Sequence, residues 1–230
     1  MNSQGLSSYF QFSNVDWGNM FSATWETVWM TVGSMIVVAI LGLALGLLLF
    51  ETTNSHNPLI KVLNWLVALF VNVFRSIPFI ILIVLLLPIT QKLVGTIIGP
   101  RAALPSLIIS AAPFYARMVE LAFHELDHGV VEAAESMGAT RWQIIRKVLL
   151  PESMPALVSG ITVTTISLIG YTAMAGAIGA GGLGTLAYQD GFQSNNNAIT
   201  LVATVIIVII VFIFQFIGDW AVRRIDKRAN

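Results

Sequence analysis

The sequence predicts an all-α, polytopic membrane protein with five transmembrane helices and one long polar loop. Hydrophobic residues make up 56% of the 230 positions, and charged residues only 10%. A soluble domain of this size cannot cover such a composition with a polar surface. The apolar residues also gather in blocks of about twenty, the length of helix that crosses roughly 30 Å of hydrocarbon. Composition and block length together define this fold class.

The five expected spans are residues 28–50, 62–88, 102–123, 156–180 and 198–217. Residues 1–27, which precede them, are polar with scattered aromatic side chains. This pattern favours an extracytoplasmic or interfacial segment, with a weakly ordered tail as the alternative. Residues 28–220 are then the transmembrane domain, and residues 221–230 form a polar tail.

The distribution of charge predicts the orientation. The loop 124–152 and the tail 221–230 carry most of the basic residues, whereas residues 1–27 contain none. Because basic residues favour the cytoplasmic side, the N-terminus is expected outside, and the loop and the C-terminus in the cytoplasm. Lys92 and Arg101, between the second and third spans, run against this rule. Twelve acidic residues balance twelve basic ones, which indicates no nucleic-acid partner.

The number of spans bears on the quaternary structure. No internal repeat is visible, and five helices do not divide into two inverted halves within one chain. If the function needs symmetry, a second copy must supply it. A homodimer about a two-fold axis normal to the bilayer is the simplest solution.

The loop 124–152 is the most informative stretch. We expect two short helices with a bend, because Gly138 can adopt a positive φ and Thr140 can cap the second helix. Pro151 is expected to end that helix. An apolar stripe is predicted on it, formed by Trp142, Ile145 and Leu149. This stripe either contacts a partner or rests on the protein's own membrane domain or on lipid headgroups.

Two polar features fall inside the expected spans. Arg75 lies well inside the second span, where a charge facing lipid is costly, so we expect it to face protein, water or a carboxylate. Pro78, three residues on, is expected to kink the helix. Arg117 and Glu120 are three apart on the third span, which places them on one helical face as an ion pair.

The stretch from Gly170 to Gly184 is dense in small residues, which allow close helix packing and a bent backbone. It ends the fourth span on the expected outer side. Tyr171 and Met174 are three apart on one face and offer a polar tip and a soft thioether. They are candidates for a pore-facing pair, with plain bundle packing as the alternative.

One motif in the loop resembles a known family. Glu132-Ala133-Ala134, three residues, Gly138, nine residues, Val148, one residue and Leu150-Pro151 resemble the signature of permease subunits of ATP-binding-cassette importers. Residues 74–79, 111–120 and 170–184 further resemble the methionine importer permeases, and the likeness covers nearly all the chain after residue 26. The resemblance implies the type I importer permease fold, in which 124–152 is the cytoplasmic coupling-helix loop. The residues that it marks for coupling to an ATPase are Glu132, Ala133, Ala134, Met137, Gly138, Ala139, Arg141, Leu150 and Pro151.

The same resemblance implies an assembly. A homodimer of permeases would work with two ATP-binding-cassette ATPase subunits and an extracytoplasmic substrate-binding lipoprotein, within the lipid of the bacterial inner (plasma) membrane. Tyr171 and Met174 would belong to the gate of the translocation path. The expected cargo is methionine, as the L or D form. No cofactor or metal is expected, and no Walker A pattern occurs, so ATP hydrolysis would lie on the partner chain.

Three alternatives stay open at this point. The first is an importer permease for another small amino acid or a dipeptide. The second is an ion-driven secondary transporter, although the spans lack a chain of carboxylates. The third is a membrane enzyme, supported only by residues 124–128, which match the zinc pattern HExxH without an evident third ligand.

Overall fold

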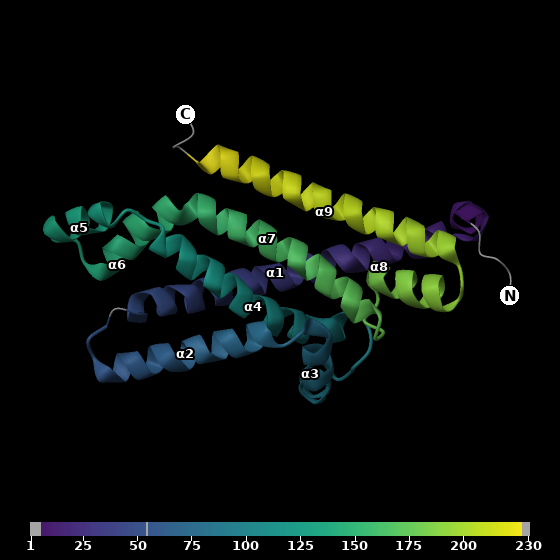
Figure 1. Cartoon of the computed structure of the whole chain (residues 1–230), viewed down its shortest axis with the longest axis horizontal. Helices are drawn as coiled ribbons and strands as arrows, with labels where there is room; N and C mark the ends of the chain where they lie inside the picture. Colours follow the sequence, from purple (N-terminus) through teal and green to yellow (C-terminus); the bar gives the residue numbers. More distant parts are fainter. Residues whose placement is uncertain (1–5, 54, 227–230) are drawn as a thin grey trace. The chain divides into compact units, whose positions relative to one another are not determined.

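The computed structural model describes residues 6–53 and 55–226, and in these ranges the regular structure is helical. Lys227 and Arg228 of the expected tail lie outside the described residues. Two short 3₁₀ turns, Leu6–Phe10 and Phe12–Asn14, precede the helices. Figure 1 labels the helices α1 (Trp17–Thr53), α2 (Pro58–Ser76), α3 (Phe79–Val94), α4 (Pro100–His124), α5 (His128–Ser136), α6 (Arg141–Ile144), α7 (Leu150–Gly176), α8 (Gly182–Thr185) and α9 (Asn197–Ile225).

Five helical stretches in the described ranges are long and apolar enough to cross a membrane, which confirms the predicted fold class. Their bounds differ from the expected ones at several ends. The stretches are Trp17–Thr53, Pro58–Ser76, Pro100–His124, Arg141–Gly176 and Asn197–Ile225. The fourth includes α6, a π-helical turn (Ile145–Leu149) and α7.

The first helix begins at Trp17 and not at Val28. Asp16 precedes it, and its carboxylate accepts hydrogen bonds from the backbone N–H groups of Gly18 (2.9 Å) and Asn19 (3.1 Å). These bonds satisfy donors that a helix start leaves unpaired. With 37 residues, α1 is about 55 Å long, which exceeds the hydrocarbon thickness. Part of α1 therefore extends beyond the hydrocarbon.

The expected single span 62–88 is wrong, because the chain breaks at Ile77–Pro78 into α2 and α3. Pro78 has an extended backbone (φ −56°, ψ 134°) and lacks the N–H that a continuing helix needs. Its ring also disfavours the helical conformation for Ile77. Pro88, by contrast, lies inside α3 and does not end it. At 16 residues, α3 is shorter than each of the five stretches that are long enough to cross a membrane.

The chain forms two compact units. One unit contains α1 up to Val37, Ile77–Ala111 and Thr165–Phe214. In its core, the N-terminal segment packs with α7, α8 and α9. The buried members are Val15, Met20, Ala23, Ile169, Leu183, Leu186, Ala198, Ala203 and Ile210.

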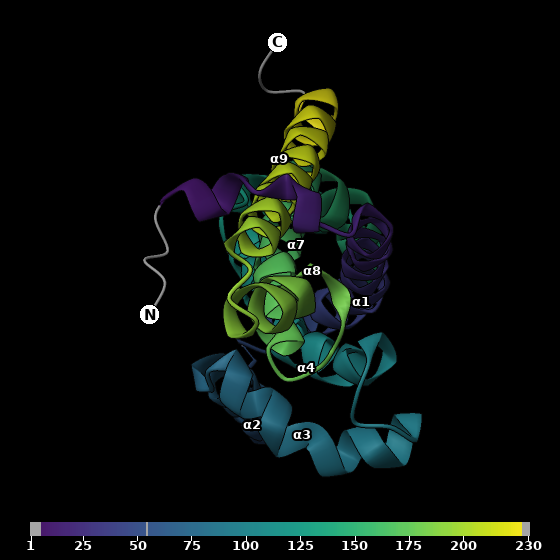
Figure 2. The same ribbon diagram turned by 90° about the vertical axis from the view of Figure 1, so that its right-hand side faces the viewer.

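Within this unit, α8 folds back against the end of α7 (Figure 2). A π-helical stretch, Leu186–Gln193, extends α8 toward α9. A Cβ atom added to Gly184 would lie 2.5 Å from the carbonyl oxygen of Ala173, and one added to Gly176 would overlap the backbone of Gly184. Only glycine allows the two helices this backbone-to-backbone approach.

The other unit contains Val38–Ser76, Ala112–Thr164 and the rest of α9. Here Gly42 and Gly46 of α1 form a G-x-x-x-G pair against α4. A Cβ at Gly46 would lie 2.5 Å from the carbonyl oxygen of Ala116. Beside this contact, Leu49, Val71 and Ala116 form a small buried cluster that joins α1, α2 and α4. Helices α5 and α6 lie next to each other, near the end of α4 and the start of α7 (Figure 1).

Candidate functional site

The bend between α5 and α6 is a fully hydrogen-bonded motif. Gly138 has φ +78°, as predicted, and its N–H donates to the carbonyl of Glu135 (2.9 Å). The N–H of Ala139 donates to the carbonyl of Ala134 (3.1 Å). These two bonds form a Schellman motif, which satisfies the free carbonyls at the end of α5. No atom lies within 4 Å of a Cβ built at Gly138, so only its backbone conformation requires glycine.

The start of α6 is equally well defined. Thr140 is the N-cap, as predicted, and its hydroxyl accepts from the N–H of Gln143 (3.4 Å). The side chain of Gln143 accepts in return from the N–H of Thr140 (2.8 Å). This capping box satisfies two donors at the helix start. The bend therefore has little freedom to change direction.

Pro151 does not end the second helix, so that expectation is wrong. The helix passes from α6 through the π-helical turn Ile145–Leu149 into α7. In this turn the N–H of Leu150 bonds to the carbonyl of Ile145, five residues back. The wider turn relaxes the crowding that a proline ring would cause in a regular helix. The stretch Arg141–Gly176 is consequently one continuous helix.

The buried face of this helix also differs from the prediction. Ile144, Ile145 and Leu149 are buried, but Trp142 is 67% exposed and does not belong to the stripe. The stripe was assigned with a regular α-helical period that began at Trp142. In the structure, the adjacent residues Ile144 and Ile145 are both buried, and the π-helical turn begins at Ile145.

The outward face of the loop carries most of the predicted coupling residues. Met137, beside the bend, is 82% exposed. Three of the predicted coupling residues are not exposed: Ala134 is buried, and Ala139 and Leu150 are half-buried. The exposed residues are Glu132, Ala133, Met137, Gly138, Arg141 and Pro151. Trp142 is also exposed, so Met137 and Trp142 are the two most exposed large apolar side chains of the loop.

Arg141 ties the loop to the end of α1. Its Nε lies 2.7 Å from Oε2 of Glu51, and its Nη2 lies 2.8 Å from Oε1 of the same carboxylate. Glu135 of α5 adds a longer contact of 3.4 Å. The two-pronged geometry fixes the orientation of the guanidinium as well as its position. Sequence reasoning did not identify Glu51, because the pair is 90 residues apart and no local pattern connects them.

If the loop couples transport to ATP hydrolysis, as the sequence resemblance implies, the charge-reversed variant Arg141→Glu is expected to lower coupled transport about fivefold, because a link of about 1 kcal/mol at the loop is lost. The double variant Arg141→Glu with Glu51→Arg should recover much of this loss. The measurement is the ratio of transport to ATP hydrolysis in the reconstituted complex. A double variant no better than the single one would exclude a role for this pair.

The candidate gate residues lie near the end of α7. The ring of Tyr171 stacks on Phe79, the first residue of α3, with ring centroids 4.7 Å apart and an interplanar angle of 12°. Phe79 is buried, and Tyr171 is half-buried. Met174 is 41% exposed in the single chain. The structure thus attaches Tyr171 to the break between α2 and α3, a contact that the sequence did not predict.

Two side chains of α1 hold the glycine-rich loop that follows α7. The carboxylate of Glu26 accepts from the N–H of Gly182 (2.7 Å), and the hydroxyl of Thr27 accepts from the N–H of Leu183 (2.9 Å). Gly181 and Gly182 have φ of +81° and +73°, conformations that favour glycine. A carboxylate at a helix N-terminus also interacts favourably with the helix dipole. Glu26 and Thr27 therefore fix where α8 begins.

The variant Glu26→Leu is expected to destabilise the protein by about 2 kcal/mol, because the N–H of Gly182 loses its acceptor in a partly buried site. Glu26→Gln keeps an oxygen that can accept, so its loss should be less than half as large. The thermal unfolding midpoint of the purified protein measures both. Equal midpoints for the leucine variant and the wild type would contradict this capping role.

The charged residues and the histidine singled out in the sequence have three different surroundings. Arg117 and Glu120 form the predicted ion pair, 2.7 Å apart. Arg75 is exposed at the end of α2, and within the described residues the structure shows no ion pair for it. His124, from the HExxH match, contacts the ring of Phe50. Among the described side chains no group of three metal-ligating residues occurs.

Five helical stretches of the described residues that are long and apolar enough to cross a membrane, with an ordered polar loop at the start of the fourth, define the class of the chain as an integral membrane protein. Residues 57–230 match the family described as binding-protein-dependent transport system inner membrane component, and the chain belongs to this family. It is 60% identical to the methionine import system permease protein MetP of Bacillus subtilis, over 94% of this chain and 98% of that protein.

Two further comparisons agree with this assignment. The probable D-methionine transport system permease protein MetI of Haemophilus influenzae is 42% identical, over 92% of this chain and 100% of that one. A solved inward-facing structure of the MetNI methionine ABC transporter contains a chain with a TM-score of 0.87 and 45% identity. That match covers 92% of this chain and 98% of the other. The type I importer permease fold is therefore shared.

Proposed function

We propose that this chain is the transmembrane permease subunit of an ATP-driven importer for methionine in the bacterial inner membrane. Two copies form the translocation path, two ATPase subunits bind their coupling loops, and an extracytoplasmic binding lipoprotein delivers the amino acid. The identity of 60% with a methionine import permease supports the choice of cargo. Hydrolysis of ATP takes place on the partner chains.

The observation that carries this proposal is the outward face of the loop 124–152. Met137 and Trp142 are the two most exposed large apolar side chains of the loop, at 82% and 67%. Apolar groups exposed together on a rigid element are typical of a docking surface. Ala133 is small enough to let a partner backbone approach. We therefore assign this face to ATPase docking.

The helix Arg141–Gly176 gives the docked motor a mechanical connection to the path. It starts at the docking face and carries Tyr171 and Met174 in its last turns. When ATP closes the ATPase dimer, the coupling loops move together and the bundle opens outward; hydrolysis resets it. The bidentate pair of Arg141 with Glu51 makes α1 follow the same motion.

The proposal includes an orientation and a division of the chain. Residues 1–27 lie on the extracytoplasmic side or at its interface, residues 28–220 form the permease domain, and residues 221–230 lie in the cytoplasm. Arg223 and Arg224 in the last turn of α9 support a cytoplasmic C-terminus.

The test is uptake by proteoliposomes that contain the permease with its ATPase and binding lipoprotein. Radiolabelled methionine should accumulate only with ATP, and an ionophore should leave uptake unchanged. Uptake that persists without ATP and collapses with the ionophore would favour a secondary transporter. Competition by unlabelled amino acids and dipeptides then tests the cargo. A dipeptide or another amino acid that competes better than methionine would contradict methionine as the cargo.

A further inference from the structure

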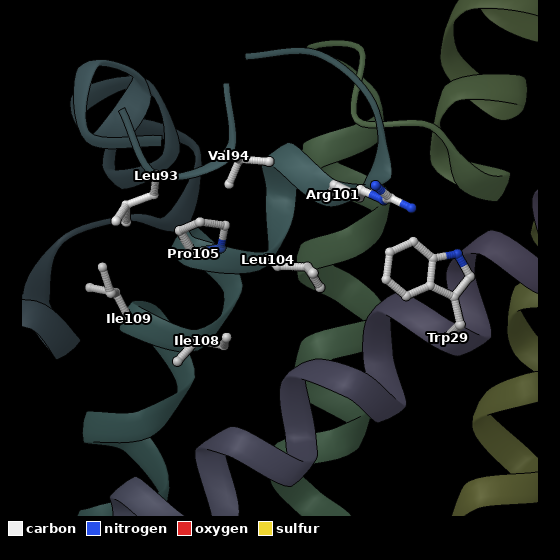
Figure 3. A pocket seen from close by; sticks show the side chains of 8 residues that line it. All are labelled: Trp29, Leu93, Val94, Arg101, Leu104, Pro105, Ile108 and Ile109. Atoms are coloured by element: carbon white, nitrogen blue, oxygen red, sulfur yellow. The ribbon is translucent and has the colours of Figure 1, made fainter. Parts of the chain in front are cut away.

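An apolar groove lies between the end of α3 and the start of α4, beside α1 (Figure 3). Its volume is about 570 Å³, and it belongs entirely to one of the two compact units. The groove is lined by Trp29, Leu93, Val94, Arg101, Leu104, Pro105, Ile108 and Ile109. The proposed transport cycle makes no use of it.

The groove is polar at one end only. Arg101 and Trp29 lie together at one end, and Leu93, Pro105 and Ile109 lie toward the other (Figure 3). Arg101 is exposed, and within the described residues the structure shows no ion pair for it. No acidic side chain lines the groove. The guanidinium of Arg101 therefore places one positive charge at one end of the apolar groove.

The length of the groove along α4 is close to the thickness of the hydrocarbon of one lipid leaflet. Helix α4 begins at Pro100 and runs into the membrane, so the wall from Arg101 to Ile109 descends about 12 Å. Half of the hydrocarbon core is about 15 Å. Arg101 and Trp29 thus lie near the headgroup boundary, where arginine and tryptophan are favoured, while the apolar wall lies at the depth of an acyl chain.

We propose that this groove binds one glycerophospholipid with an anionic headgroup. One acyl chain lies along Leu104, Pro105 and Ile108, and the phosphate pairs with the guanidinium of Arg101. The site also explains why a basic residue is present in a loop where the positive-inside rule disfavours it. A protein helix would fill the apolar wall but would leave Arg101 without a counter-charge, unless it carried an acid at that depth. The proposal is independent of the cargo.

The native fluorescence of Trp29 provides the test. The full chain, in complex with its partners, is placed in nanodiscs that contain phosphatidylglycerol or phosphatidylcholine with brominated acyl chains. The quenching that disappears in Trp29→Phe is assigned to Trp29. We expect the brominated phosphatidylglycerol to quench this component with roughly fivefold higher apparent affinity than phosphatidylcholine.

Variants separate the site from general lipid contact. Arg101→Gln should abolish the preference, whereas Lys92→Gln, which removes an exposed charge nearby but outside the groove, should keep it. Ile109→Phe, which fills the apolar end without adding a second indole, should weaken quenching of Trp29 by both lipids. Equal affinity of the wild type for the two lipids would overturn the proposal. Trp29 that neither lipid quenches would also overturn it, since the groove would then be covered by protein.

Discussion

Replacing Gly184 with alanine is expected to lower the free energy of unfolding by about 3 kcal/mol. The added Cβ would lie 2.5 Å from the carbonyl oxygen of Ala173 and 2.6 Å from its Cα. Both are backbone atoms, so no side-chain rotation can relieve the overlap. Helices α7 and α8 would have to separate. The thermal unfolding midpoint and the yield of monodisperse protein measure this change.

Gly170→Ala is the matched control for this experiment. Gly170 lies on α7, the helix that Gly184 of α8 packs against, and no atom lies within 4 Å of a Cβ placed there. Alanine also has the higher helix propensity, so this variant should be neutral or slightly stabilising. A Gly184 variant as stable as the Gly170 variant would show that α8 does not pack on α7 as described.

Replacing Gly138 with valine is expected to reduce coupled transport about tenfold while membrane insertion and total protein stay normal. Its φ of +78° is strained for a β-branched residue, by roughly 1–2 kcal/mol. The Schellman motif would open, and α5 and α6 would no longer present Met137 and Trp142 in fixed positions. ATP hydrolysis would then proceed with little transport. The ratio of methionine transported to ATP hydrolysed is the measurement.

Gly138→Asn separates conformation from size. Asparagine tolerates a positive φ far better than valine, and the site has room for its side chain. The asparagine variant should keep transport within about twofold of the wild type. If valine and asparagine impair coupling equally, the loss would come from a lost contact with the ATPase and not from the backbone conformation. Normal coupling in the valine variant would count against a docking role for the bend.

The sequence predicted the features that depend on short segments. The five spans follow from apolar blocks, and the bend follows from Gly138 and Thr140, whose preferred conformations are local. The G-x-x-x-G pair Gly42 and Gly46 was also readable as a close helix contact, although it was not identified. Arg117 and Glu120 were predictable because helix geometry alone brings residues three apart together.

Prolines were harder to interpret because their effect depends on the surrounding backbone. Pro78 breaks the helix completely, Pro88 lies within α3, and Pro151 is accommodated by a π-helical turn. The π-helical turn begins at Ile145, and Ile144 and Ile145 are both buried although they are adjacent. A regular helical period does not allow for this and wrongly places Trp142, which is exposed, on the buried face. Residue type alone does not distinguish a break, a kink and a π-helical turn.

The long-range polar contacts could not be predicted at all. Glu51 and Arg141 are 90 residues apart, and Glu26 and Gly182 are 156 residues apart. Each pair depends on which helices become neighbours, and one sequence does not specify this. These two contacts fix the loop 124–152 and the glycine-rich loop. The interactions that are hardest to predict from the sequence therefore determine the positions of both candidate regions.

The position of the docking face can be measured directly, because the chain contains no cysteine. A single cysteine at Trp142 should cross-link to the ATPase in the assembled complex and should react with reagents only from the cytoplasmic side. A cysteine at Phe192, which is also 67% exposed, serves as the control and should not cross-link to the ATPase. A Trp142 cysteine that reacts only from outside, or that yields no ATPase adduct in an active complex, would contradict the assignment of the loop as the coupling element.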